Sequence, residues 1–178
     1  MVDMGELFAV FLRGINVGGV RIAMKDLQQA LAAAGFAGVR TLLASGNVVL
    51  EADTGAGSVK ERVESALRER FGYEAWVIVK TAPQVHAIVA RYPFGSSPGL
   101  HAYAVLATEA ETVTDLVGAL EPSPTERWQA AGDVLYWEVP KGSSLDTNLA
   151  KRLAQAKYKP LTTTRNLNTL EKVAAALA

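Results

Sequence analysis

Cysteine is missing from the sequence and histidine is rare, with only His86 and His101 among 178 residues. The absence of thiols excludes disulfides, iron–sulfur clusters, thiolate zinc sites and cysteine nucleophiles. Two histidines cannot build a three-histidine metal centre, and the carboxylates show no clustered spacing that would supply other ligands. We therefore expect neither a metal ion nor a cofactor, and we expect both histidines to have structural or surface roles.

An excess of charge of either sign is also missing, because 18 lysines and arginines balance 18 aspartates and glutamates. No overall field therefore attracts the chain to polyanions or lipid head groups. The N-terminus lacks the pattern of a secretory signal, since Asp3 and Glu6 stand where positive residues belong. The apolar run Leu7–Leu12 is too short to cross a bilayer. We expect a cytoplasmic protein without a membrane partner.

Familiar phosphate-binding motifs are absent as well. The glycine-rich segment Gly14–Gly19 follows a predicted strand, but Val20 and Arg21 stand where a P-loop has lysine followed by serine or threonine. A dinucleotide fingerprint of the form G-x-G-x-x-G is missing too. The two common nucleotide-binding loops are thus excluded.

Apolar residues make up 49% of the chain, enough to bury a core, and their spacing predicts the secondary structure. The strands expected in the first half are Leu7–Leu12, Val39–Leu43, Val48–Glu51 and Trp76–Val79. The helices expected there are Met24–Ala34, Ser58–Phe71 and Pro83–Arg91. Ser58 and Glu61 have the spacing of a capping box at the start of the second helix.

The second half shows the same succession of patterns. Its expected strands are Ala102–Ala107, Arg127–Ala130, Val134–Glu138 and Leu161–Thr163. Its expected helices carry apolar stripes over Val113–Leu120, Leu145–Leu153 and Leu167–Leu177. Asn168 and Glu171 again have capping-box spacing.

Both halves therefore have the element order β-α-β-β-α-β-α. This order predicts an α+β protein of two ferredoxin-like (βαββαβ) subdomains, each an antiparallel sheet with helices packed on one face. The segment Tyr92–Leu100, rich in proline, glycine and serine, is the predicted linker between subdomains at residues 1–91 and 101–178. The second sheet face of each subdomain is left for the other subdomain, a partner or a ligand.

Aromatic residues gather in the second predicted hairpin, at Trp128, Tyr136 and Trp137. Alternation along a strand places Tyr136 and Trp137 on opposite faces of the sheet. Aromatic side chains on such a sheet can stack on nucleobases, but the basic-aromatic signature of RNA-recognition domains is missing here. We therefore expect these rings to pack against one another across strands.

Three polar segments stand where packing alone would not require them: the end of the first strand, the first hairpin turn, and the expected start of the last helix. An arginine at the end of a buried strand needs an acceptor or an anion, and a helix N-terminus offers backbone amides to a carboxylate or phosphate. The candidate ligand-binding residues are Arg13, Asn16, Ser45, Asn47, Arg165, Asn166 and Asn168.

Purely structural roles are open for several of these side chains. Asn47 can cap its own turn, and Thr164, Asn166 or Asn168 can cap the last helix. If the segments instead form one site, Arg13 and Asn16 lie near Arg165 and Asn166, because ligands collect at strand ends where loops and helix N-termini supply donors.

The three segments resemble motifs of a bacterial family known as domain of unknown function 1697. The motifs are Leu12–Gly19, Ser45–Val49 and Thr164–Thr169, and the resemblance extends from Phe8 to Val173. The sequence departs from the family at Leu167, where tryptophan is usual. The resemblance implies paired ferredoxin-like subdomains and no established activity.

Three functions fit the sequence. The first, which we favour, is binding of a small anionic ligand, a nucleotide or a nucleic-acid segment by the arginine and asparagine donors. The second is a metal-independent enzyme that orients a small anionic substrate through the same donors. The third is an assembly module, such as a homodimer, that associates through a free sheet face.

Overall fold

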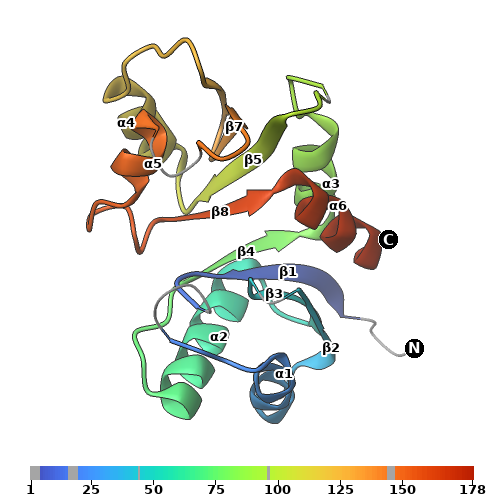
Figure 1. The fold of residues 1–178 in the computed structure, drawn as a ribbon. Coiled ribbons are helices and arrows are strands. Elements are labelled where there is room, and N and C mark those ends of the chain that lie inside the picture. Colours follow the sequence, from blue (N-terminus) through green and yellow to red (C-terminus); the bar gives the residue numbers. More distant parts are fainter. Residues whose placement is uncertain (1–4, 16–19, 44, 96, 144–146) are drawn as a thin grey trace. The chain divides into compact units, whose positions relative to one another are not determined.

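The first half of the chain forms a four-stranded antiparallel sheet with strand order β2-β3-β1-β4, as the computed structural model shows (Figure 1). The structure describes residues 5–15, 20–43, 45–95, 97–143 and 147–178. Its strands are β1 (Glu6–Leu12), β2 (Ala37–Leu42), β3 (Asn47–Ala52) and β4 (Val77–Thr81). β1 is central and is buried from Phe8 onward, which accounts for its unbroken apolar sequence.

Helices α1 (Met24–Ala33) and α2 (Ala56–Phe71) pack on one face of this sheet (Figure 1). Strand alternation turns one set of apolar residues toward the helices, and the apolar stripes of the helices meet them. The core includes Phe8, Val10 and Leu12 from β1, Val48 and Leu50 from β3, Leu27 and Leu31 from α1, and Val59, Val63 and Leu67 from α2.

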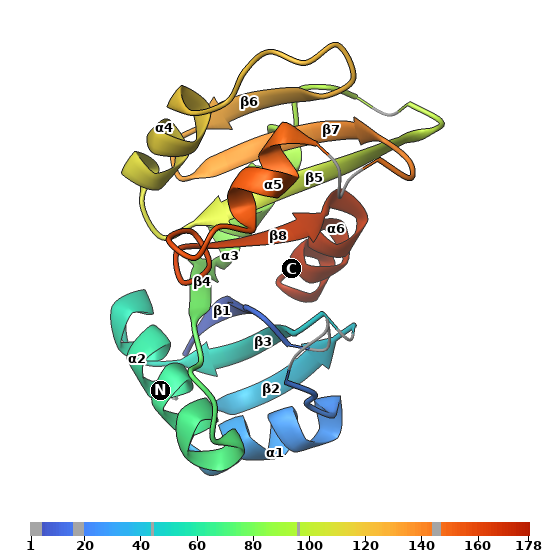
Figure 2. The ribbon, with the colours of Figure 1, turned by 60° about the vertical axis from the view of Figure 1, so that its left-hand side comes forward.

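The second half forms a separate antiparallel sheet in the equivalent order, β6-β7-β5-β8 (Figure 2). Its strands are β5 (Leu100–Ala107), β6 (Arg127–Ala131), β7 (Val134–Pro140) and β8 (Thr162–Asn166). Helices α4 (Ala110–Gly118) and α5 (Asn148–Leu153) cover one face. Trp137 faces these helices, whereas the Tyr136 hydroxyl on the opposite face donates to the Ile88 carbonyl at 2.7 Å, as alternation predicted.

The predicted fold class is confirmed, because both sheets have the ferredoxin-like strand order and all their pairings are antiparallel. The predicted element order is also confirmed, with α3 (Ala82–Ala90) and α6 (Leu167–Ala176) following the two sheets.

The chain folds into two compact units. One unit is made of Met1–Ala87 with Glu171–Ala178, and the other is made of Ile88–Leu170. The divisions fall inside α3 and α6. The end of α6 is held within the first unit, because Nη2 of Arg40 donates to the Ala176 carbonyl at 2.6 Å. The segment expected as a linker connects α3 to β5. The subdomain limits at residues 91 and 101 stay a prediction.

Both predicted capping boxes are wrong. α2 begins at Ala56 after Gly55, with no side-chain cap, so Ser58 lies inside the helix. Asn168 likewise lies inside α6, and its backbone amide donates to Oδ1 of Asn166 at 2.8 Å. α2 starts two residues before its predicted cap and α6 one residue before its own, because local spacing does not distinguish a cap from the first turn.

Candidate functional site

The first hairpin turn is closed by its own polar side chains. Nδ2 of Asn47, a side chain with no exposed surface, donates to the Leu42 carbonyl at 2.9 Å and to Oγ of Ser45 at 2.8 Å. These two bonds use both amide hydrogens within the turn. Asn47 therefore shapes the turn, as the capping alternative predicted, and Ser45 lies beside it on the surface.

The end of β1 packs directly on this turn. The Leu12 amide donates to the Gly46 carbonyl at 2.8 Å. Gly46 has a φ of +84°, and a Cβ atom there would lie 2.8 Å from Cδ1 of Ile15 and 2.9 Å from Cβ of Leu12. Only glycine fits this position without displacing its neighbours. The contact brings Arg13, the residue after Leu12, to the same end of the sheet as Ser45 and Asn47.

The other side of Arg13 is fixed by the segment that leads into β4. The Arg13 amide donates to the Trp76 carbonyl at 3.1 Å. Arg13 is half-buried, and burial lowers the pKa of its guanidinium from the ordinary value because the charged form is desolvated. Arg13 thus carries a positive charge that is partly shielded from water at the end of the central strand.

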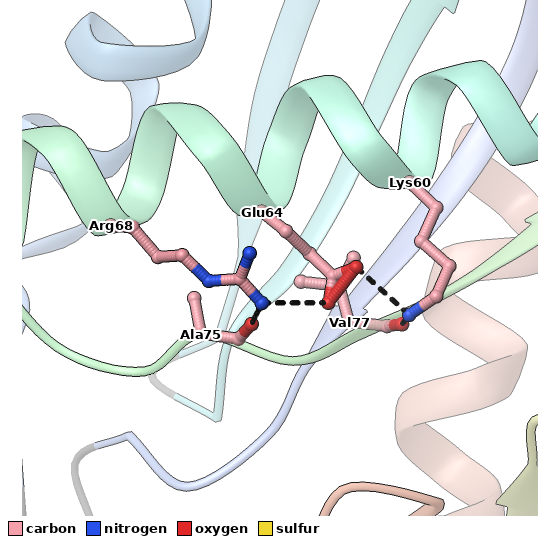
Figure 3. A network of polar contacts seen from close by, with 5 residues as sticks. All are labelled: Lys60, Glu64, Arg68, Ala75 and Val77. Atoms are coloured by element: carbon pink, nitrogen blue, oxygen red, sulfur yellow. Dashed lines mark hydrogen bonds and ion pairs between the residues drawn. The ribbon is translucent and has the colours of Figure 1, made fainter.

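A network on α2 holds the carbonyls on either side of Trp76 (Figure 3). Nη2 of Arg68 donates to the Ala75 carbonyl at 3.1 Å, and Nζ of Lys60 donates to the Val77 carbonyl at 2.8 Å. Glu64 lies between the two cations, 3.1 Å from Lys60 and 3.9 Å from Arg68. This network was not predicted, although the spacing of the three charged residues at i, i+4 and i+8 was a readable signal.

Arg165 and Asn166 are the last two residues of β8, directly before α6 begins at Leu167, and Oδ1 of Asn166 accepts the Asn168 amide as a cap of that helix. Arg165 is 6% exposed, and its Nη1 donates to Oγ1 of Thr163 at 2.6 Å and to the Thr164 carbonyl at 3.0 Å. The strand forms because a run of β-branched threonines pairs with β5. Asn166, the next residue, faces the opposite side of the sheet.

The structure therefore brings some candidate residues together and separates others. Arg13, Ser45 and Asn47 share one end of the first sheet. Arg165 and Asn166 point to opposite faces of the second sheet, and Asn168 is exposed on α6. Asn16 lies outside the described residues. The proximity of Arg13 and Asn16 to Arg165 and Asn166 stays a prediction.

The described residues contain no group of three or more histidine or acidic side chains arranged to hold a metal ion. Within the described part of the chain, none of the helices has the length and apolar composition needed to span a bilayer.

Gly95–Gly99 has the G-x-S-x-G spacing of a nucleophile elbow, a pattern that the sequence analysis did not consider. This segment leads from a helix to a strand, whereas a nucleophile elbow leads from a strand to a helix.

The family model described as "Protein of unknown function (DUF1697)" matches residues 6–136. The chain belongs to the DUF1697 family. The resemblance inferred from the motifs is thus confirmed. The family match includes the motifs at Arg13 and Ser45 and ends before the motif at Thr164–Thr169.

One solved structure supports the fold of the chain. The conserved bacterial protein SP0830 from Streptococcus pneumoniae is similar at a TM-score of 0.81 and 23% identity, with 98% of this chain and 99% of that chain covered. An unknown protein from Galdieria sulphuraria matches at a TM-score of 0.28 and 14% identity, over 90% of this chain and 96% of that chain, too weakly to bear on the fold. No curated protein matches the sequence significantly.

Proposed function

We propose that this DUF1697 protein binds a small organic anion, carrying a phosphate or carboxylate group, at the end of the first sheet. The observation that carries this proposal is the position of Arg13. Its backbone is held between the β2–β3 turn and the Trp76 carbonyl, and its guanidinium is half-buried. A guanidinium forms two parallel hydrogen bonds with phosphate or carboxylate, and these bonds strengthen when water is partly excluded.

The turn beside Arg13 carries a second feature that supports a site here. Leu43 has a φ of 61° and is 45% exposed. The left-handed conformation costs a leucine about 1 kcal/mol, and its side chain gains little from burial at this position. Strained, exposed residues of this kind concentrate at ligand-binding turns. We assign Leu43 to contact with the apolar part of the ligand.

Binding is preferred to catalysis because of the chemistry of the groups gathered at this end. Arginine orients and neutralises anions but does not exchange protons at neutral pH. The Asn47 amide is engaged within the turn. These groups suit recognition of an anion, and none of them is a general base.

A thermal-shift assay with matched variants tests the proposal. Wild type, Arg13→Ala, Arg13→Lys and Arg70→Ala are compared with inorganic phosphate, adenosine monophosphate, a sugar phosphate and a short oligonucleotide at constant ionic strength. Arg70, exposed on α2, serves as the control for loss of one positive charge. We expect organic anions to stabilise wild type and Arg70→Ala, and Arg13→Ala to weaken binding by about 1.5–3 kcal/mol.

Arg13→Lys keeps the charge and loses the paired hydrogen bonds, so it should retain only part of the response. The proposal fails if no anion stabilises wild type at millimolar concentration. It also fails if Arg13→Ala unfolds more readily while its response to the sugar phosphate, which carries no base, is the same as that of wild type.

A further inference from the structure

A row of aromatic side chains crosses the second sheet on the face that carries α4 and α5. Strand register places Trp128 of β6, Trp137 of β7, Tyr103 of β5 and Asn166 of β8 opposite one another in succession. His101 lies two residues before Tyr103 and therefore on the same face. Four strands thus contribute one continuous line of planar groups.

The rings of this row are close and only moderately tilted. The ring centroids of Tyr103 and Trp137 are 5.1 Å apart with an interplanar angle of 33°. Those of His101 and Tyr103 are 5.5 Å apart with an angle of 41°. These separations lie in the range of aromatic contacts, so His101, Tyr103 and Trp137 lie ring against ring along the row.

Core packing buries the ring of Trp137 but leaves the other rings of the row partly exposed. Trp137 is 4% exposed and belongs to the core under the helices. Tyr103 and Trp128 pack against that core while staying partly exposed, and His101 is also partly exposed. α5 has only six residues. In both ribbon views, the start of β5 and the end of β7 extend past α4 and α5 (Figures 1 and 2).

The row also holds an unused hydrogen-bond donor. Nε1 of Trp137 is buried and has no acceptor among the described residues. A buried N–H without an acceptor is unfavourable and rare in folded proteins. An acceptor on a ligand would satisfy it once a neighbouring side chain moves aside. The amide of Asn166 lies further along the same row, and its Nδ2 can donate while its Oδ1 accepts the Asn168 backbone amide.

We infer that this row, which we name the aromatic row (His101, Tyr103, Trp128, Trp137), binds a planar heterocyclic ring with a hydrogen-bond acceptor, that is, a nucleobase. Stacking on the partly exposed rings supplies affinity, and the indole N–H and the Asn166 amide supply polar contacts. The site is distinct from the anion site proposed at Arg13. A base from a free nucleoside and a base from single-stranded nucleic acid present the same chemistry.

Tryptophan fluorescence tests the inference directly, because two of the three tryptophans belong to the aromatic row. The background variant Trp76→Phe removes the third. Uridine, adenosine and a uridine hexanucleotide are titrated, and ribose 5-phosphate serves as the ligand without a base. We expect saturable quenching by nucleosides or by the oligonucleotide, and none by ribose 5-phosphate. Binding of the oligonucleotide alone identifies single-stranded nucleic acid as the source of the base.

Two surface variants and one buried variant locate the binding. In the Trp76→Phe background, Trp128→Leu and His101→Ala should each weaken binding about five-fold or more. Trp137→Phe keeps a ring and removes the N–H, and should weaken binding about two- to ten-fold. Circular dichroism and urea unfolding establish that each variant is folded. The inference is overturned if no base quenches saturably at about 10 mM, or if the folded Trp128→Leu and His101→Ala proteins bind as tightly as the background.

Discussion

Gly46 shows how a single residue can join two sequence motifs. It has a left-handed backbone, and its missing side chain leaves the space that Leu12 and Ile15 occupy. A motif at the end of β1 and a motif in the next hairpin are therefore one packed unit. This contact fixes the backbone on which Arg13 stands.

Replacement of Gly46 by alanine should lower the free energy of unfolding by about 2–4 kcal/mol, because an unfavourable φ is combined with a steric clash. Gly99 is a matched control, since its φ is +83° and nothing lies within 4 Å of a Cβ built there. Gly99→Ala should cost only about 1 kcal/mol. Urea unfolding of the two variants measures the difference. Equal losses would show that Leu12 and Ile15 do not constrain Gly46.

Individual side chains were the hardest features to predict from sequence. The capping role of Asn47 followed from its place in a turn. Arg165 and Asn166 precede the last helix as expected, but the strand that they end was predicted only to Thr163. Its full length depends on the pairing of Thr162–Asn166 with β5, which is a long-range contact.

Strands and helices were predicted well because, in each of them, the spacing of the apolar residues along the sequence matches the side that is buried in the structure. β1 reads as a continuous apolar run and is buried on both faces. α1 and α4 show three- and four-residue apolar steps. Helix starts were predicted less well, since α2 begins after a glycine and without a side-chain cap. Its position is set instead by packing and by contacts such as those of Glu64.

Glu64→Gln tests how α2 is attached to the start of β4. The substitution keeps the shape of the side chain but removes the charge that holds Lys60 and Arg68. We expect a loss of about 1 kcal/mol in the free energy of unfolding, smaller in about 1 M salt because screening already weakens the ion pairs. Glu69, exposed on the same helix, provides the control variant Glu69→Gln. A salt-independent loss, or an equal loss for both variants, would contradict the ion-pair network.

At the scale of the whole molecule, composition and element order were enough to predict two ferredoxin-like subdomains. The same element order in both halves of the chain is compatible with few other topologies, since a βαββαβ unit forms one antiparallel sheet with helices on one face. The candidate site was predicted in part, because Arg13, Ser45 and Asn47 share one end of a sheet. The aromatic row was not predicted as a row, because it depends on the register of three strands, β5, β6 and β7.

Stability at alkaline pH should depend on tyrosines from both units. Burial raises the pKa of Tyr73 to about 12, and burial together with the nearby Glu138 carboxylate raises the pKa of Tyr92 to about 12, with Arg127 opposing. The folded state keeps these protons while the unfolded state releases them near pH 10. The contribution of the protonated Tyr73 and Tyr92 hydroxyls to the free energy of unfolding is therefore fully present below about pH 10. It is lost as the pH rises toward about 12.

Absorbance at alkaline pH, recorded on wild type, Tyr73→Phe and Tyr92→Phe, measures these ionisations while near-ultraviolet circular dichroism reports the fold. Each variant should remove one late-ionising tyrosine and reduce the decline in stability above pH 10. Ionisation of all five tyrosines at about pH 10 in protein that is still folded would contradict the burial of Tyr73 and Tyr92.

The central claim, an anion site at the end of the first sheet, is tested most directly by a nuclear magnetic resonance titration. Uniformly ¹⁵N-labelled protein is titrated with ribose 5-phosphate, an organic anion without a base, at constant ionic strength, and its amide and arginine Nε–H signals are followed. We predict saturable changes concentrated at Arg13, Gly14, Leu43 and Gly46, and their loss in Arg13→Ala. Changes spread over the exposed lysines and arginines, or the same local changes in Arg13→Ala, would contradict the account.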